Sequence, residues 1–231
     1  MKNEVKVIGF DADDTLWVNE PYYREAEAQY ARLLSDYADE EKVTQQLYER
    51  EMENLSLYGY GIKSFVISMI ENAMEITGGG VSNGLVKEII EMGRQMMQKP
   101  VEVLSGVEQV LRALGGRYRL IVVTKGDLLD QERKLERSGL SEHFHHIEIM
   151  SDKKPAHYQR LLKHLDISPQ RFCMIGNSLR SDILPPLELG AYAIHVPYHI
   201  TWVHEEVGEQ VADHPRLYVR DRIDEVKELF A

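Results

Sequence analysis

Short apolar runs recur along the chain, and longer amphipathic stretches separate them. The apolar runs lie at residues 5–10, 120–124, 147–150, 171–175 and 192–196, with a shorter one at 217–219. Continuous runs of this kind, rather than strict alternation, are typical of parallel strands covered on both faces. Helical periodicity fills the intervals near 106–114, 128–138, 156–165, 182–189 and 222–230, with Asp127 as the expected N-cap of the second. The chain from about residue 100 therefore predicts a doubly wound α/β domain.

A different pattern occupies residues 20–98. This region has almost no β-branched runs, and its helical stretches lie near 21–37, 41–54, 62–77 and 83–97. Glycine-containing breaks fall at residues 58–61 and 78–80. Because the first apolar run belongs with the later strands, an all-helical segment is inserted behind it, and Lys99-Pro100 marks the return. The predicted division is an α/β core of residues 1–18 and 99–231 and a helical domain of residues 19–98.

Composition narrows the class of protein. A chain of 231 residues with 43% hydrophobic and 28% charged residues can bury a substantial core. Its formal net charge of −11 argues against nucleic-acid and anionic-membrane partners, which require clustered Lys and Arg. The single cysteine, Cys173, excludes an intramolecular disulfide and fits a reducing cytosol. With no signal-peptide core and no run of apolar residues long enough to span a membrane, we expect a soluble cytoplasmic protein. Its oligomeric state stays open.

An acidic cluster, Asp11-Ala12-Asp13-Asp14-Thr15, follows the first apolar run directly. Ligand crevices of open α/β sheets lie outside the carboxyl ends of the strands, where this cluster is expected. Three neighbouring carboxylates repel one another, and a divalent cation such as Mg²⁺, which prefers oxygen ligands, relieves that repulsion. A solvated Asp-rich turn or a helix N-cap is the alternative, and the cluster alone leaves it open.

Three later segments give the cluster a context. Thr124 ends the second apolar run, Lys154-Pro155 stands at the head of a predicted helix, and Gly176-Asn177-Ser178-Leu179-Arg180-Ser181-Asp182 follows the run 171–175. With all four segments in this order, the chain resembles the haloacid dehalogenase superfamily of phosphatases. The resemblance implies a Rossmann-like sheet with an inserted helical cap, Mg²⁺ as cofactor and a small phosphorylated metabolite as substrate.

The resemblance also implies roles for the acidic cluster. Asp11 attacks phosphorus as the nucleophile and forms an aspartyl-phosphate. Asp13 protonates the leaving oxygen and then deprotonates the attacking water, while its backbone carbonyl completes the Mg²⁺ shell. Asp14 and Thr15 are expected to be structural, as a cap or a support of the loop.

Phosphate and metal contacts follow from the later segments. Thr124 is expected to hydrogen-bond a phosphoryl oxygen, with the backbone N–H groups of Lys125 and Gly126. Lys154, immediately before the proline, matches the family position and is expected to offset charge on Asp11 and the phosphoryl group, whereas Lys153 is expected to be solvated. Many relatives carry Asp after the glycine of the last segment. Here Asn177 supplies only a neutral oxygen, so the expected metal ligands are Asp11, Asp13, Asn177 and Asp182.

Several alternatives stay open from the sequence. A haloacid dehalogenase shares the nucleophile but needs no acid such as Asp13, a phosphomutase differs in its cap, and a binding protein on the same fold is compatible with Asn177. Cys173 is expected in the core. The histidines match no zinc pattern, although the segment 199–204 could contact the rim of the crevice. In the helical domain, six side chains could face substrate or simply pack: Tyr22, Tyr23, Arg24, Tyr58, Tyr60 and Lys63.

Overall fold

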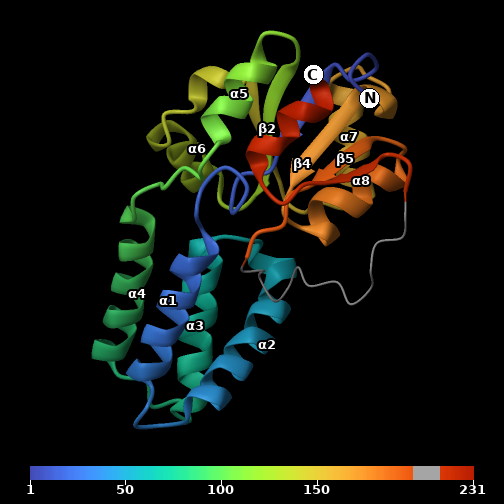
Figure 1. The fold of residues 1–231 in the computed structure, drawn as a ribbon. Helices are drawn as coiled ribbons and strands as arrows, with labels where there is room; N and C mark the ends of the chain where they lie inside the picture. The colour runs from blue at the N-terminus through green and yellow to red at the C-terminus, as the bar shows by residue number, and fades with distance from the viewer. Residues whose placement is uncertain (200–213) are drawn as a thin grey trace. The chain divides into compact units, whose positions relative to one another are not determined.

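A parallel sheet forms the centre of the α/β unit (Figure 1). A computed structural model describes residues 1–199 and 214–231 of the chain. Within these residues the sheet has six strands in the order β3-β2-β1-β4-β5-β6, and every neighbouring pair is parallel. The strands are β1 (Val7–Phe10), β2 (Arg119–Lys125), β3 (His146–Met150), β4 (Phe172–Gly176), β5 (Tyr192–His195) and β6 (Leu217–Val219). The predicted strands and the α/β class are confirmed.

The side chains of the central strands alternate between two apolar layers. Ile8, Leu120 and Cys173 belong to one cluster of buried residues, and their neighbours Val7 and Ile121 belong to another. The first cluster includes residues of α5 (Val107–Gly115), α6 (Leu128–Arg137) and the C-terminal 3-10 helix η5 (Ile223–Phe230). The second includes residues of α7 (Pro155–His164). Because helices cover both faces, the central strands bury consecutive apolar residues, such as Leu120–Val123 of β2, which is why the runs do not alternate in the sequence.

Two predicted helices differ from the structure. The expected helix 182–189 is a π-helix, η3 (Leu179–Ile183), followed by the short α8 (Leu184–Glu188). Pro185 and Pro186 lie in the first turn of α8, where a missing N–H group costs nothing, but they cannot donate the hydrogen bonds that would join η3 and α8 into one regular helix. The expected α-helix 222–230 is the 3-10 helix η5. Short 3-10 turns, η1 (Ser141–His143) and η2 (Pro169–Arg171), precede β3 and β4.

The chain divides into two compact units. One comprises residues 1–20, 101–125 and 131–231, and the other comprises residues 21–100 and 126–130. The second contains four helices inserted between β1 and β2, so the predicted helical insertion is confirmed. They are α1 (Glu20–Leu33), α2 (Glu40–Tyr58), α3 (Ile62–Ile76) and α4 (Asn83–Gln98).

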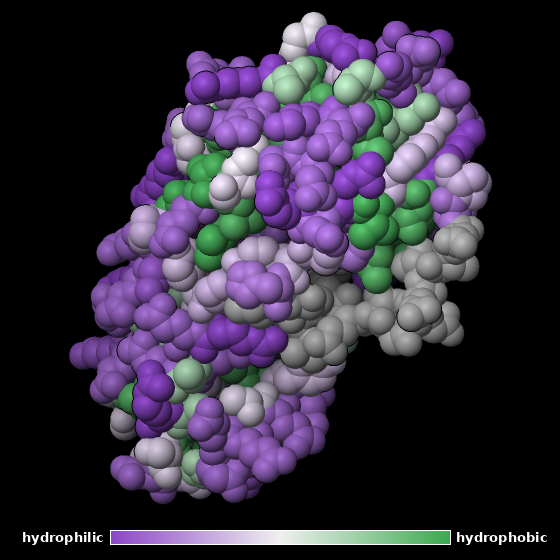
Figure 2. Space-filling view, in the orientation of Figure 1, coloured by the Kyte–Doolittle hydropathy of each residue, from purple (hydrophilic) through white to green (hydrophobic). Residues whose placement is uncertain are grey.

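The helical unit has a core of its own. Tyr30, Leu34, Val43, Met69 and Ile89 are completely buried in it. Hydrophilic residues cover most of this unit on the face shown in Figure 2. Along the described residues, no helix combines the length and apolar composition that crossing a membrane requires.

The buried thiol of Cys173 provides a test of the core. Cys173 has no exposed surface, and burial raises the pKa of its thiol. Since the thiolate is the reactive form, we expect a thiol reagent at about pH 8 to leave the native protein unmodified and to label it once guanidinium unfolds it. Mass spectrometry counts the labels. The control variant Glu142→Cys adds an exposed thiol that reacts in the native state, and equally fast labelling of Cys173 would contradict its burial.

Candidate functional site

The carboxyl ends of β1 and β4 bring the acidic cluster beside the last segment of the sequence pattern. Phe10 pairs with Ile175 in the parallel register, and the Asp11 N–H donates to the Ile175 carbonyl at 2.8 Å. β1 lies between β2 and β4, so Asp11 leaves the sheet where the strand order reverses. This is the position at which open α/β sheets bind ligands.

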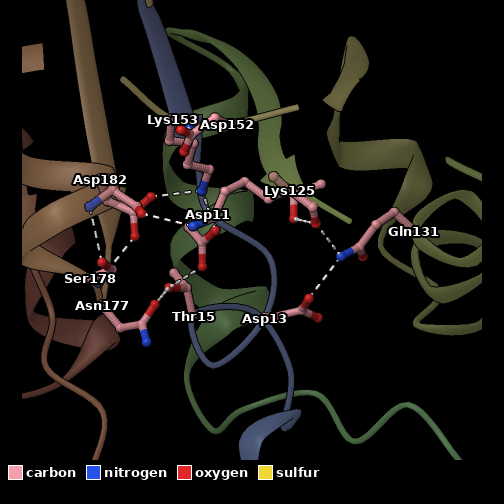
Figure 3. A network of polar contacts seen from close by, with 12 residues as sticks. Asp11, Asp13, Thr15, Lys125, Gln131, Asp152, Lys153, Asn177, Ser178 and Asp182 are labelled. Carbon is pink, nitrogen blue, oxygen red and sulfur yellow. Dashed lines mark hydrogen bonds and ion pairs between the residues drawn. The ribbon is translucent and has the colours of Figure 1, made fainter. Parts of the chain in front are cut away.

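A buried lysine joins two carboxylates at this point (Figure 3). The Lys153 ammonium donates to Asp11 Oδ1 and, at 2.7 Å, to Asp182 Oδ1. Only 1% of the Lys153 side-chain surface is exposed. The ammonium therefore compensates two buried negative charges that come from different ends of the sequence.

The prediction that Lys153 is solvated is wrong. Lys154, which the sequence placed at the phosphate, has a side chain that is 71% exposed and pairs with Asp152 at 2.8 Å. The backbone at Lys154 is extended, with φ −94° and ψ 165°, and neighbouring side chains of an extended segment point to opposite sides. Pro155 begins α7 as expected. The side chain that points into the site is that of Lys153, two residues before this proline, and not that of Lys154.

The environment of Asp11 shifts the pKa of its carboxyl group upward. Burial, together with the charge of Asp182, raises the pKa of Asp11 to about 7, although Lys153 opposes this shift. Burial alone would lower the pKa of the Lys153 ammonium, but the charges of Asp11 and Asp182 outweigh it and raise that pKa. Lys153 therefore stays charged and holds both carboxylates.

Oxygen atoms suited to a divalent cation converge beside this pair. The Thr15 hydroxyl lies 3.0 Å from Asp11 Oδ2 and 3.1 Å from the Asn177 amide oxygen, so both oxygens are within reach of one group. Asp182 Oδ2 accepts the N–H of Ser178 at 3.1 Å, which orients its carboxylate. Two carboxylates and an amide oxygen fit Mg²⁺. Thr15, expected to be structural, contacts both candidate ligands.

Carboxylates and histidines alone do not provide a metal site. Across the described parts of the chain, no group of three or more His, Cys, Asp or Glu side chains is placed to hold a metal ion. A cation beside Asp11 and Asp182 therefore has to draw on neutral oxygens such as that of Asn177. Asn177, which stands where many relatives carry Asp, places this amide oxygen in the loop after β4.

Asp13 has a different environment from Asp11, two residues away. Its Oδ1 accepts hydrogen bonds from Trp17 Nε1 at 2.8 Å and Lys134 Nζ at 3.0 Å, and its Oδ2 accepts one from Gln131 Nε2 at 2.7 Å. Burial opposes ionisation, but the charge of Lys134 and these hydrogen bonds together lower the pKa of Asp13. The two carboxylates thus lie in different environments, although only one residue separates them in the sequence.

Gln131 and Lys134 were missed in the sequence, although one signal was available. Gln131 lies four residues before the buried Leu135 on the apolar face of α6, where a polar side chain requires a partner. Its amide oxygen has no hydrogen-bond partner among the described residues, a cost of about 1–3 kcal/mol. A buried glutamine on that face of the predicted helix 128–138 indicates an interaction that offsets this cost.

The three phosphate-binding candidates lie at the carboxyl end of β2 or directly after it. Thr124 is buried at the carboxyl end of β2, with its hydroxyl 3.1 Å from the Lys125 carbonyl oxygen. The Lys125 ammonium donates to Ser181 Oγ at 3.0 Å, so this side chain reaches the segment after β4. Gly126 has φ 128°, a backbone conformation that favours glycine. The predicted roles of these three residues in binding phosphate stay predictions.

Asp14 supports the loop, as predicted. Its carboxylate accepts the N–H of Asn19 at 2.9 Å and that of Glu20 at 3.0 Å, at the start of α1. Asp127 likewise accepts the N–H of Asp130 at 3.2 Å, as expected for the N-cap of α6.

The histidines and the aromatic side chains of the helical unit have structural contacts. His195 Nε2 lies 2.9 Å from the Asn177 carbonyl oxygen. His199 is exposed, and residues 200–204 of the proposed rim segment lie outside the described residues. Among the helical-unit candidates, Tyr23 packs on Phe65, Tyr22 lies under the Lys99 ammonium, Arg24 pairs with Glu27, and Lys63 pairs with Asp127.

Comparisons with known proteins show the family and the fold of the chain. Residues 5–190 match a family model described as haloacid dehalogenase-like hydrolase. The N-acylneuraminate-9-phosphatase of Rattus norvegicus is 23% identical over 224 residues, which cover 92% of this chain and 88% of that protein.

Solved structures show the same fold. A haloacid dehalogenase-like family hydrolase from Xanthomonas campestris is 41% identical with a TM-score of 0.84, over 98% of this chain and 89% of that one. A putative hydrolase from Bacillus subtilis bound to magnesium shares the fold at 18% identity and a TM-score of 0.64, over 98% and 99% of the two chains.

The two adjacent lysines allow a matched test of the site. Lys153→Met leaves Asp11 and Asp182 without their shared counter-charge, so we expect it to lower the free energy of unfolding by about 3 kcal/mol. Lys154→Met removes an exposed ion pair and should change it by less than about 1 kcal/mol. Guanidinium unfolding of the Mg²⁺-free proteins at neutral pH measures both values. Equal losses in the two variants would contradict the assignment of Lys153.

Proposed function

Because the chain belongs to the haloacid dehalogenase-like hydrolases, we propose that it is a Mg²⁺-dependent phosphatase acting on a small phosphomonoester. The observation that carries the proposal is the pair Asp11 and Asp13, which share one loop after β1 but have different partners. Asp11 contacts the Lys153 ammonium, whereas Asp13 accepts hydrogen bonds from Gln131 and Lys134. A nucleophile and a separate acid–base group are what a two-step transfer through an aspartyl-phosphate requires.

In the first step, an Asp11 carboxylate oxygen forms a bond to phosphorus while the bond from phosphorus to the ester oxygen breaks. Asp13 gives its proton to the departing alkoxide. In the second step, water attacks phosphorus, the bond to Asp11 breaks, and Asp13 takes the proton from the water. Free phosphate and the original two carboxyl groups result, so the cycle is balanced.

Charge has to be offset at the site, because the substrate and its nucleophile are both anionic. Lys153 is the lysine that we assign to this role, in place of Lys154, because its ammonium already contacts Asp11. The Thr124 hydroxyl and the N–H groups of Lys125 and Gly126 are proposed to bind the phosphoryl oxygens. Asp11, Asn177, Asp182 and the Asp13 carbonyl would hold a Mg²⁺ ion, which would supply further positive charge beside the phosphoryl group.

The proposed substrate class is a small phosphorylated metabolite. It is supported by the curated relatives, which are phosphatases of an N-acylneuraminate 9-phosphate at 22–24% identity. A haloacid dehalogenase is disfavoured by Asp13, because a departing halide needs no proton. A phosphomutase would transfer the phosphoryl group to a second sugar hydroxyl instead of water, so phosphate release separates the two reactions.

Hydrolysis of an aryl phosphate tests the proposal. We expect the purified protein to release phosphate from 4-nitrophenyl phosphate with Mg²⁺ and to stop when EDTA removes the ion. Asp11→Asn should lower kcat by about 1000-fold or more, since the amide cannot attack phosphorus. Glu142→Gln, which changes an exposed residue far from Asp11 in the sequence, serves as the control. Unchanged activity in Asp11→Asn would refute the mechanism, and no turnover by the wild-type protein would favour a binding role.

The neutral ligand Asn177 leads to a second prediction. Asn177→Asp adds a third carboxylate beside Asp11 and Asp182, so it should lower the thermal stability of the Mg²⁺-free protein through repulsion. With Mg²⁺ the added charge becomes favourable, and the ion should bind about tenfold more tightly. Thermal unfolding across a Mg²⁺ titration measures both effects, with Asn177→Ala as the comparison. A stabilised Mg²⁺-free Asn177→Asp protein would contradict the proposed ligand set.

A further inference from the structure

The carboxylate of Asp13 is held in one orientation by donors from two parts of the α/β unit. Trp17 belongs to the same loop as Asp13, whereas Gln131 and Lys134 lie on α6, more than 100 positions later. The two α6 residues are three apart and therefore share a face of the helix. Their positions make the direction of Asp13 depend on where α6 packs.

Gln131 links Asp13 to the candidate phosphate-binding segment. Its amide nitrogen donates to Asp13 Oδ2 at 2.7 Å and to the Lys125 carbonyl oxygen at 2.8 Å. The reversed amide would place its oxygen against two acceptors, so the hydrogen bonds decide its orientation. The amide oxygen then has no hydrogen-bond partner in the described part of the chain. A fully buried polar atom is thus left unsatisfied while the amide nitrogen bridges two elements of the site.

Lys134 links Asp13 to the segment that leads into α1. Its ammonium donates to Asp13 Oδ1 at 3.0 Å and to Asn19 Oδ1 at 2.8 Å. Asn19 in turn donates its N–H to Asp14 at 2.9 Å. The ammonium therefore ties both ends of the loop 13–19 to α6, and 17% of its side-chain surface is exposed.

The three hydrogen bonds leave one acceptor position on Asp13. Oδ1 accepts from both Trp17 and Lys134, which uses its two lone pairs. Oδ2 accepts from Gln131, and the described residues supply no second donor to it. The Asp13 side chain as a whole keeps 25% of its surface exposed. Oδ2 is therefore the atom through which Asp13 can exchange a proton with a bound molecule.

We propose that Gln131 and Lys134 are positioning residues that aim Asp13 Oδ2 at the leaving oxygen of the substrate. This inference rests on the proposed phosphatase function, in which Asp13 is the acid. Lys134 occupies Oδ1, and Gln131 sets the plane of the carboxyl group relative to the Lys125 segment. Neither residue touches the substrate, and both act through Asp13.

Leaving groups of different basicity test the proposal. An alkoxide must be protonated as it departs, whereas 4-nitrophenolate departs readily without a proton. We therefore expect Lys134→Met and Gln131→Met to lower kcat for an alkyl phosphate, such as glycerol phosphate, about tenfold or more beyond their effect on 4-nitrophenyl phosphate. The KM values of Lys134→Met should change by less than about threefold, because this side chain contacts none of the proposed phosphoryl-binding groups.

Conservative and control variants separate positioning from general loss of structure. Lys134→Arg retains a cationic donor and should recover most of the activity on the alkyl ester. Arg133→Met removes a charge from an exposed neighbouring position of α6 and should behave as wild type on both substrates. Thermal unfolding shows which variants are folded. If Lys134→Met does not fold, Lys134→Gln, which keeps a neutral donor, replaces it.

The outcomes are distinguishable. A selective loss on the alkyl ester, with rescue by Lys134→Arg, supports the positioning role. Equal losses on both esters overturn it, and so does an unchanged ratio of the two kcat values in folded variants. If the wild-type protein hydrolyses neither ester with Mg²⁺, the phosphatase proposal itself fails, and this inference fails with it for that separate reason.

Discussion

The ion pair of Lys153 with Asp11 and Asp182 is the interaction on which the candidate site depends. Asp11 ends β1 and Asp182 lies in η3 after β4, and the parallel pairing of these strands forces the two carboxylates together. Two buried carboxylates that lie this close to one cation binding position repel each other, and a cation between them offsets that repulsion. Lys153 supplies one from the loop before α7, so three segments far apart in the sequence have to fold correctly before the charges balance.

This balance also gives meaning to the acidic composition of the chain. A net charge of −11 by itself excludes partners more readily than it identifies them. Its distribution is more informative, because Asp11 and Asp13 face different cations. Burial and the charge of Asp182 raise the pKa of Asp11, whereas at Asp13 the charge of Lys134 and the hydrogen bonds together outweigh burial and lower the pKa. An anionic substrate can approach such carboxylates only where positive charge, from Lys153 or a bound ion, reverses the local sign.

The packing of α6 connects the two halves of this arrangement. Its apolar face contributes Leu135 to the core under the sheet, and the same face carries Gln131 toward Asp13 and the Lys125 carbonyl. Lys134 extends the connection to Asn19. Burial of a helix against the sheet thus orients a carboxylate of the loop after β1, and the cost is one unsatisfied amide oxygen. Stability and the orientation of the site are therefore set by the same helix.

The α/β class, the helical insertion and the location of the acidic cluster follow from the sequence without any knowledge of the tertiary structure. These features depend on local periodicity and on position relative to strand ends, which neighbouring residues encode. Which of Lys153 and Lys154 contacts Asp11 depends on the tertiary structure. The backbone before α7 is extended, so the two neighbouring side chains point to opposite sides and only that of Lys153 points into the site. The tertiary structure also decided the partners of Asp13, since Gln131 and Lys134 reach it through the packing of α6 on the sheet, a contact that no local pattern specifies.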